Sequence, residues 1–232
     1  MPSIITFGSF SVIALGGTTA AIAAVVPYGL TAGSRAPTLG ASSVPSWPPT
    51  NYVSDQTTNA DDNNYVVSLP FTFYFNGTAY TSTYVGSNFY LTFGGGSSQY
   101  SGLSPSAPAL DKIMFVSGDH SWQRVGHLTT NNYMRVRFEG SNSTSGTGGA
   151  SQDIYEATFL NPSLTNNLPT IEMRLGVFGV TSGVTGIYSA SGTNLTSSSW
   201  TPTANTSYVI QSTNTTGTSW NIYSNYYIAN IV

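Results

Sequence analysis

From about residue 51 to the end of the chain, apolar and polar residues alternate with a period of two. In the stretch LPFTFYF, Phe71, Phe73 and Phe75 fall on one face, and Thr72 and Tyr74 fall on the other. This alternation is typical of an antiparallel strand that turns one face to a core. The same pattern predicts strands above all in four segments, residues 66–75, 134–139, 154–159 and 171–175.

Turn signals separate these segments. Asn76-Gly77 is the strongest short hairpin signal. A run of three glycines at residues 94–96 ends the strand pattern of residues 84–93. No segment sustains a 3.6-residue period over three turns. We therefore predict an all-β fold, an antiparallel β-sandwich, for residues 51–232. Further strand-like runs cover residues 84–85, 89–93, 184–188, 207–211 and 219–231.

Residues 1–50 follow a different pattern. The segment is apolar at first and then rich in Pro, Gly and Ser up to Pro49, which favours an extended chain with no partners of its own. Fixing such a chain costs about 1–2 kcal/mol of backbone entropy per residue. Burial against a partner offsets this cost by about 25 cal/mol for each Å² of apolar surface removed from water. We therefore predict an assembly arm with a Pro-rich linker. The residues expected to be buried against the partner are Phe7, Phe10, Ile13, Leu15, Ile22, Val25 and Val26.

The arm lacks the features of a leader peptide and of a membrane span. No Lys or Arg precedes Arg35, so the positively charged region of a signal peptide is missing. Glycines and threonines between residues 8 and 19 interrupt the apolar run, which makes it a poor membrane span. We interpret the segment as a retained structural arm and expect no membrane contact.

The composition favours a neutral, assembled protein. Only 6% of the residues are charged, against roughly 25% in an average soluble domain. The net charge of −3 comes with only six Lys and Arg, which cannot build a groove for nucleic-acid phosphates. Low charge also means little repulsion between copies, so we expect a homo-oligomer. The chain has no cysteine, which excludes disulfides and thiolate metal sites.

Six of the few charges share the polar phase of three successive predicted strands. If those strands are neighbours, the charges form a cross-strand ladder on one outer face. Exposed pairs of this kind contribute on the order of 0.2–1 kcal/mol each, so their expected role is register more than stability. The six residues are Arg135, Arg137, Glu139, Glu156, Glu172 and Arg174.

Two short motifs carry candidate chemistry. Asp119 and His120 in DHSW could form an Asp-His relay, but no nucleophile elbow accompanies them, and we interpret the motif as a polar turn. Asp61-Asp62 is rich in oxygen, but its spacing does not fit an EF-hand loop. A solvated turn is favoured there, and a calcium ion is the open alternative. We predict no catalytic residue and no cofactor, and no zinc or iron site, because suitable ligand spacing is absent.

The C-terminal segment is rich in aromatic residues. Trp220, Tyr223, Tyr226 and Tyr227 could stack on the apolar faces of sugar rings. Aromatic residues of β-proteins more often belong to a core or to a subunit interface. The four residues are therefore candidates for glycan contact or for an interface, and the sequence leaves both alternatives open.

The segment 69–94 resembles the nidogen-like domain family. The family signature is an aromatic alternating strand, a turn, and then Tyr-Val-x-Ser-Asn-Gly-x-Leu-x-Phe. Here Tyr84-Val85 begins the matching run, and Phe89 stands where the family usually has Gly. The later runs YMRVRFEG, DIYEATFLNP and TIEMRLG lie where that family has its next core strands. The resemblance implies a nidogen-like or jelly-roll-like sandwich.

A second resemblance covers roughly residues 50–232. The runs GDHSWQRV, YMRVRFEGSNSTSGT and DIYEATF are similar to virion structural proteins of tailed bacteriophages. This resemblance implies a non-catalytic β domain on the outside of a particle. It does not imply a place on that particle.

We therefore expect a non-enzymatic virion protein, a tail appendage, fibre or adaptor component that binds other virion proteins through residues 1–50. Two alternatives stay open, a capsid decoration protein and a carbohydrate-binding adhesin that contacts host surface glycans. A glycan-cleaving enzyme needs paired carboxylates in a cleft. With only nine acidic residues in the chain, we do not expect one.

Overall fold

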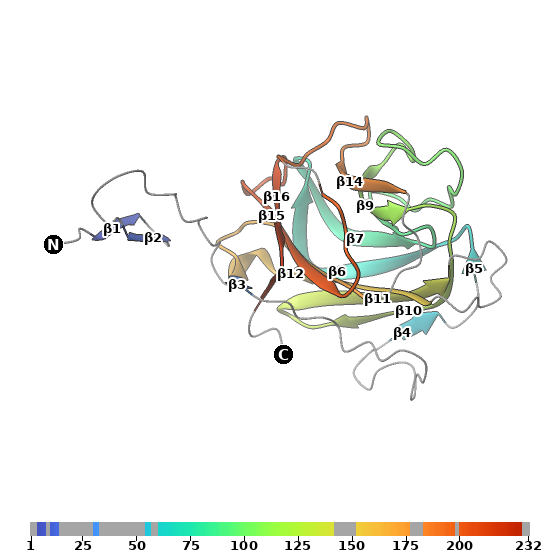
Figure 1. Ribbon diagram of the computed structural model, residues 1–232, viewed down its shortest axis with the longest axis horizontal. Helices are drawn as coiled ribbons and strands as arrows, with labels where there is room; N and C mark the ends of the chain where they lie inside the picture. Colours follow the sequence, from blue (N-terminus) through green and yellow to red (C-terminus); the bar gives the residue numbers. More distant parts are fainter. Residues whose placement is uncertain are drawn as a thin grey trace.

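The computed structural model describes residues 60–141, 152–176, 183–197 and 200–228, together with the backbone of four short strands nearer the N-terminus. Within these residues, every regular element is a β-strand except one 3-10 turn, Pro162–Leu164. All pairings inside the two main sheets are antiparallel. The all-β prediction is confirmed (Figure 1).

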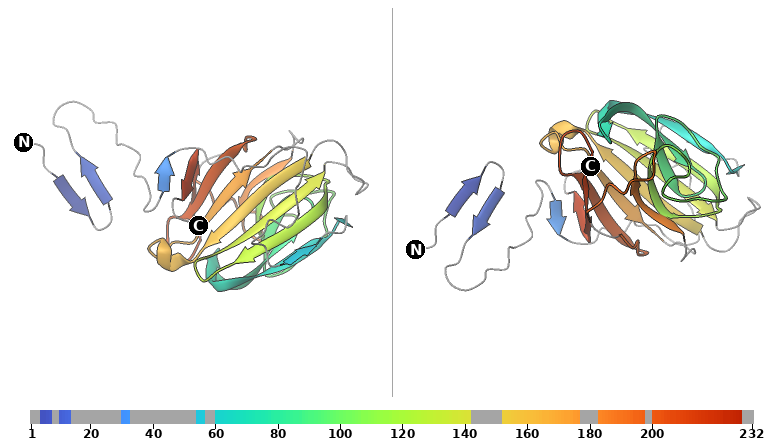
Figure 2. Two further views of the ribbon diagram at one scale, coloured as in Figure 1. Left: turned by 90° about the horizontal axis from the view of Figure 1, so that it is seen from below. Right: turned by 90° about the horizontal axis from the view of Figure 1, so that it is seen from above.

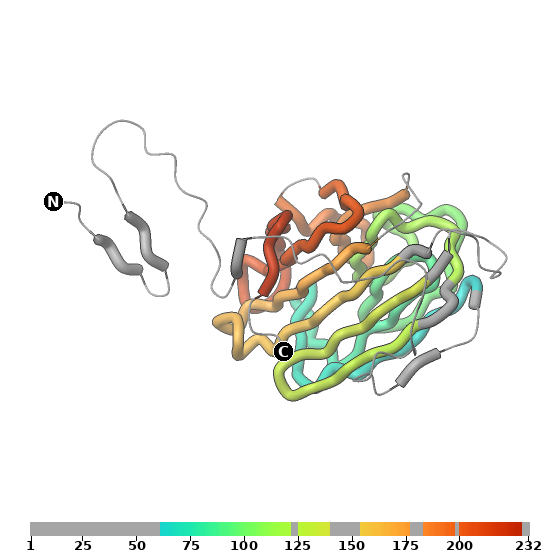
Figure 3. Tube along the Cα trace, turned by 60° about the horizontal axis from the view of Figure 1, so that its bottom comes forward, coloured from blue at the N-terminus to red at the C-terminus, as the bar shows by residue number. Residues whose placement is uncertain are grey.

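The larger sheet contains eight strands. Their order in space is β16-β15-β13-β12-β11-β10-β4, and β5 also pairs with β10. Figure 3 shows its central strands lying side by side across one face of the molecule. The bounds are β4 (Ser54–Gln56), β5 (Ala60–Asp61), β10 (Ser121–Thr129), β11 (Tyr133–Ser141), β12 (Gln152–Leu160), β13 (Thr170–Leu175), β15 (Thr206–Ser212) and β16 (Trp220–Ser224).

The smaller sheet contains five strands in the order β14-β9-β8-β7-β6. The predicted hairpin at Asn76-Gly77 joins β6 to β7, and both residues have positive φ, 48° and 80°, as a tight primed turn requires. Pairing of β6 with β7 breaks between Ser68 and Phe73. The bounds are β6 (Asn64–Phe75), β7 (Thr78–Gly86), β8 (Tyr90–Phe93), β9 (Asp111–Ser117) and β14 (Val184–Tyr188).

The two sheets stack face to face and enclose an aromatic core (Figure 2). Phe73 and Phe75 of the smaller sheet are fully buried, and Phe71 is partly buried against the same core, which confirms the predicted phase. Phe73 meets Phe159 of the larger sheet edge to face, with ring centroids 5.2 Å apart. Such contacts stabilise beyond the burial of area alone. The dense aromatic strand therefore fills the sandwich core.

The C-terminal run differs from the single strand expected over residues 219–231. It divides into β16 and β17 (Tyr226–Ile228) at Asn225, whose φ of 61° turns the chain. Strand β17 leaves the large sheet and pairs with β3 (Leu30–Ala32). Ile228 joins a second apolar cluster with Tyr133 and Val209. The C-terminal strand therefore covers part of the outer face of the large sheet.

Phe89 has a conformation that is unusual for its residue type. Its φ is 64°, a left-handed value that glycine adopts freely and that a bulky residue rarely adopts. Its ring is buried and lies edge to face against Phe138, with centroids 4.7 Å apart. Its carbonyl oxygen accepts hydrogen bonds from Ser117 Oγ and from the Phe115 amide. The turn thus has a glycine-type backbone, and the phenylalanine that occupies it adds a ring to the core.

The predicted charge ladder exists on neighbouring strands β11, β12 and β13. Register places Arg137, Glu156 and Arg174 in one row across the three strands. Glu156 lies 3.5 Å from Arg137 Nη1 and 3.8 Å from Arg174 Nη1. Each arginine also makes a shorter pair along its own strand, with Arg137 Nη2 2.7 Å from Glu139 and Arg174 Nε 2.6 Å from Glu172.

The expectation of an exposed ladder is wrong. Glu139, Glu156 and Glu172, which are all the glutamates of the chain, are at most 7% exposed. One cause is β17, because the amide of Ile228 donates a hydrogen bond to Glu172 Oε2. Buried charges depend strongly on their partners, so the ladder matters more for stability than an exposed one.

The N-terminal arm lies mostly outside the described residues. Strands β1 (Ile4–Phe7) and β2 (Phe10–Ile13) form an antiparallel pair, and their backbones contain Phe7, Phe10 and Ile13. The other residues expected to be buried, Leu15, Ile22, Val25 and Val26, lie outside the described part. Among the described residues, no helix has the length and apolar character to cross a membrane.

Candidate functional site

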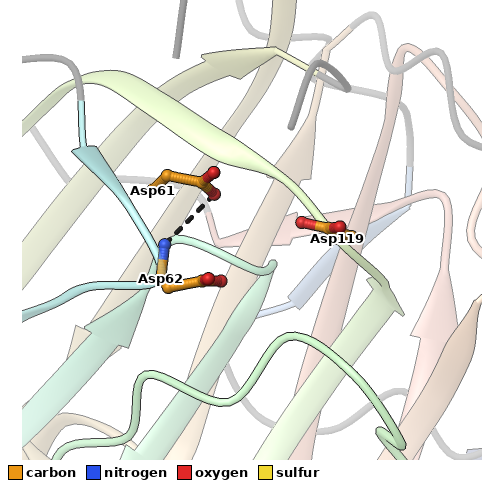
Figure 4. Close-up of side chains that lie close together, drawn as sticks. All are labelled: Asp61, Asp62 and Asp119. Atoms are coloured by element: carbon orange, nitrogen blue, oxygen red, sulfur yellow. Dashed lines mark hydrogen bonds between the residues drawn. The ribbon is translucent and has the colours of Figure 1, made fainter. Parts of the chain in front are cut away.

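Three carboxylates meet at one end of the sandwich (Figure 4). Asp61 ends β5, Asp62 lies in the turn before β6, and Asp119 lies in the turn between β9 and β10. One carboxylate oxygen from each lies within 4.8 Å of the others. The sequence identified the first two residues. Asp119 joins them because β5 pairs with β10 and places Asp61 opposite Ser121.

A buried asparagine holds the two turns together. Asn88 Nδ2 donates to Asp62 Oδ1 at 3.2 Å and to the carbonyl of Gln99 at 3.1 Å. Its Oδ1 accepts from the amide of His120 at 2.7 Å. Asp61 and Asp119 remain exposed. Three carboxylate oxygens are half or fewer of the six to eight ligands that calcium takes, and exposed acidic groups are common without an ion.

Burial and neighbouring negative charges both act on the Asp61 carboxyl. Burial, followed by the charges of Asp62 and Asp119, raises the pKa of the Asp61 carboxyl above 3.8. A raised carboxyl pKa means that the folded state disfavours the ionised form. The corresponding loss of stability is present above the folded pKa and disappears as the pH falls below the unfolded value.

We expect Asp119→Asn to lower the pKa of Asp61 and to raise stability slightly at pH 7, by no more than about 0.5 kcal/mol. The reason is the removal of one of the charges that raise this pKa. The gain should vanish as the pH falls below about 4. Carboxyl NMR titration and urea unfolding in EDTA measure both effects. A destabilised variant would contradict repulsion and would indicate that Asp119 has a favourable partner.

The two histidines do not form a relay with Asp119. His120 is buried with its ring 4.6 Å from that of Phe89, whereas the Asp119 side chain lies with the other carboxylates. His127 Nδ1 lies 2.9 Å from the Tyr65 hydroxyl, and burial lowers the pKa of its imidazole. Within DHSW, Asp119 and His120 form the turn before β10, and Ser121 and Trp122 begin the strand.

A separate buried pair, Asp111 and Lys112, has a structural arrangement. Asp111 accepts from Asn76 Nδ2, from the Ala190 amide and from the Tyr80 hydroxyl. Burial, followed by the hydrogen bond to Asp111, raises the pKa of Tyr80 to about 12. Lys112 Nζ donates to the carbonyls of Pro108 and Leu110, and burial lowers its pKa. These groups tie strand β9 to the surrounding turns.

The structure separates the four C-terminal aromatic residues. Trp220 is 0% exposed, stacks in the core against Phe73 and donates from Nε1 to the Gly217 carbonyl. The sugar-contact and interface alternatives are therefore wrong for Trp220. Tyr223 and Tyr226 lie edge to face and pack on the outer apolar cluster. Tyr227 is half-buried on β17. The four do not form one stacking surface.

A groove that the sequence did not reveal lies along β6. Its volume is about 510 Å³, within the roughly 300–1,000 Å³ of small-molecule sites. Phe71, Tyr74 and Pro162 provide its apolar lining. The rest of the lining is polar and uncharged and comes from three separate segments, namely Thr72, Asn161, Ser163, Asn167, Thr215 and Thr216. Because these segments are far apart in sequence, no local motif could have found them.

Comparison of the chain with family models, with curated proteins and with solved structures found no match.

Proposed function

We propose that the protein is a non-enzymatic structural component of a tailed-phage virion, a tail appendage, fibre or adaptor on the particle exterior that works as a homo-oligomer. The observation that carries the proposal is the placement of charge. All three glutamates and two of the five arginines pair in the ladder, and the only lysine is buried. The described surface is thus left mainly with neutral hydrogen-bonding groups, which suit close packing of copies.

The separation of acidic groups from the groove supports a non-catalytic role. Glycosidases use two carboxyl groups on either side of a substrate cleft. In the described part of this chain, no carboxylate lines the groove along β6. The three clustered aspartates belong to turns at β5 and β10. The acidic side chains that could act as acid or base and the groove that could hold a ligand are therefore in different places.

Two alternative functions use the same fold. A capsid decoration protein would place the sandwich on a head lattice, and particle cryo-EM distinguishes it from a tail component. A carbohydrate-binding adhesin is favoured by one observation, the uncharged groove with an exposed tyrosine. The adhesin role can coexist with a structural one.

We expect deletion of residues 1–35 to leave a folded β domain that no longer assembles with itself or with other virion proteins. The core of the described residues is built from side chains between Val67 and Trp220, so circular dichroism should retain its β signature. Analytical ultracentrifugation should show a multiple of 24.5 kDa for the full chain and a single copy for the variant. Cryo-EM of complemented particles tests incorporation.

A shorter deletion separates two causes of failure. Removing residues 1–29 keeps β3, which pairs with β17, whereas removing residues 1–35 exposes the edge of β17. Equal loss of assembly in both variants would support the apolar arm as the anchor. Normal assembly of both would contradict the anchoring role.

A further inference from the structure

The lining of the groove along β6 combines two kinds of surface. Tyr74 is 39% exposed and offers part of its ring, beside the partly buried Phe71. Thr72, Asn167 and Thr215 add exposed hydroxyl and amide groups. An aromatic face beside neutral hydrogen-bonding groups matches a sugar ring, which has apolar C–H faces and hydroxyl edges.

Several of these polar groups have hydrogen-bonding capacity to spare. Within the described residues, the side chains of Thr72, Asn167 and Thr215 make no hydrogen bond to another protein group. Asn161, by contrast, is committed to structure, since Oδ1 accepts from the Ser163 amide and Nδ2 donates to the Asn131 carbonyl. The lining is thus divided into groups that build the walls and groups that face outward.

The walls of the groove are fixed before any ligand arrives. The amide of Asn76 donates to the Gly217 carbonyl, and that of Gly77 donates to Thr216, both at 2.8 Å. These bonds fasten the β15–β16 loop to the β6–β7 turn. Inside the loop, Asn214 Oδ1 accepts from the amide and the hydroxyl of Thr216. A rigid site loses little conformational entropy on binding, which favours affinity.

The opposite wall is equally constrained. Asn167 has φ of 62°, and its amide donates to the Pro162 carbonyl at 2.7 Å. This turn directs the Asn167 side chain into the lining of the groove. No described lining residue carries a charge at neutral pH, so the groove provides no ion pair for a sulfate, a carboxylate or a basic peptide.

We infer that this groove binds a neutral sugar unit of an oligosaccharide, with Tyr74 stacking on the ring and Asn167, Thr72 and Thr215 bonding its hydroxyls. The inference does not rest on the assembly role, because it comes from the groove alone. Without a carboxylate in the lining, the sugar is bound and not cleaved. A proline-rich peptide on the same aromatic surface is the competing occupant that the test must separate.

The test uses the full chain on an array of neutral oligosaccharides built from glucose, galactose, mannose and their N-acetylamino derivatives, with sialylated and sulfated glycans beside them. Calorimetry then gives Kd for the neutral hits in 50 and 500 mM salt. We expect binding of at least one neutral class, with Kd unchanged by salt because no charges pair.

Variants locate the site. Tyr74→Ala should weaken binding at least tenfold, and Asn167→Ala several-fold. Tyr100→Ala is the matched control, because Tyr100 is also exposed, at 48%, and does not line the groove. It should leave Kd unchanged. Circular dichroism confirms that each variant is folded.

Four results would overturn the inference. They are the absence of any neutral hit, a preference for charged glycans, binding that survives Tyr74→Ala, and displacement of the neutral glycan by a proline-rich peptide of higher affinity. The oligomeric state is measured on the same samples by ultracentrifugation. A protein that assembles but binds no sugar would refute the groove assignment and leave the structural role standing.

Discussion

Arg174→Met is expected to lower the free energy of unfolding by about 3–5 kcal/mol. The substitution leaves the carboxylate of Glu172, which is 0% exposed, without the guanidinium 2.6 Å away. It also removes one of the two arginines beside Glu156. A buried charge that loses its partner keeps its desolvation cost and loses the attraction that offset it. Urea unfolding measures the change, with an unchanged m value indicating a pure stability effect.

Arg135→Met provides a matched control on the same face. Arg135 donates from Nε to the Thr158 hydroxyl at 2.9 Å and lies over the ring of Tyr133, and no glutamate in the described part depends on it for an ion pair. Its replacement should cost about 1 kcal/mol, the size of a hydrogen bond. Equal costs for the two arginines would show that the ladder contributes no more than ordinary surface contacts.

At position 89, we expect glycine to be more stable than alanine, which reverses the usual order. Phe89→Ala removes a buried ring and should cost about 3–5 kcal/mol. Phe89→Gly removes the same ring, but the φ of 64° suits glycine and costs an L-residue about 1–2 kcal/mol. The glycine variant should therefore be about 1 kcal/mol more stable than the alanine variant. Neither reaches the wild type, because the lost ring outweighs the relieved backbone.

Phe138 supplies the reference for this comparison. It contacts Phe89, is fully buried and lies in an ordinary strand position of β11. There, glycine should be about 0.5–1 kcal/mol less stable than alanine, because glycine loses more backbone entropy on folding. Finding the same order at both positions, by urea unfolding of all four variants, would contradict a left-handed backbone at Phe89.

The sequence predicted the local features of the fold well. Alternation at Phe71, Phe73 and Phe75 gave the correct core face, and Asn76-Gly77 gave the correct hairpin. The shared phase of Arg137, Glu156 and Arg174 gave the ladder. These predictions succeed because the two-residue period of a strand is fixed by backbone geometry, which depends on neighbours in sequence. The break at Asn225 was missed, since the aromatic residues around it continue the strand-like pattern.

Only the tertiary structure decided how deeply and beside what each side chain lies. The strand phase placed Glu172 on an outer face, and the return of β17 over that face buried it. Asp119 and Asp61 are 58 positions apart in the sequence, and they lie close together because β5 pairs with β10. The groove needed three distant segments to converge. A strand's period determines which way a side chain points. Burial and proximity depend on which distant strands pack there, and that follows from the free energy of the whole sandwich and not from any single segment.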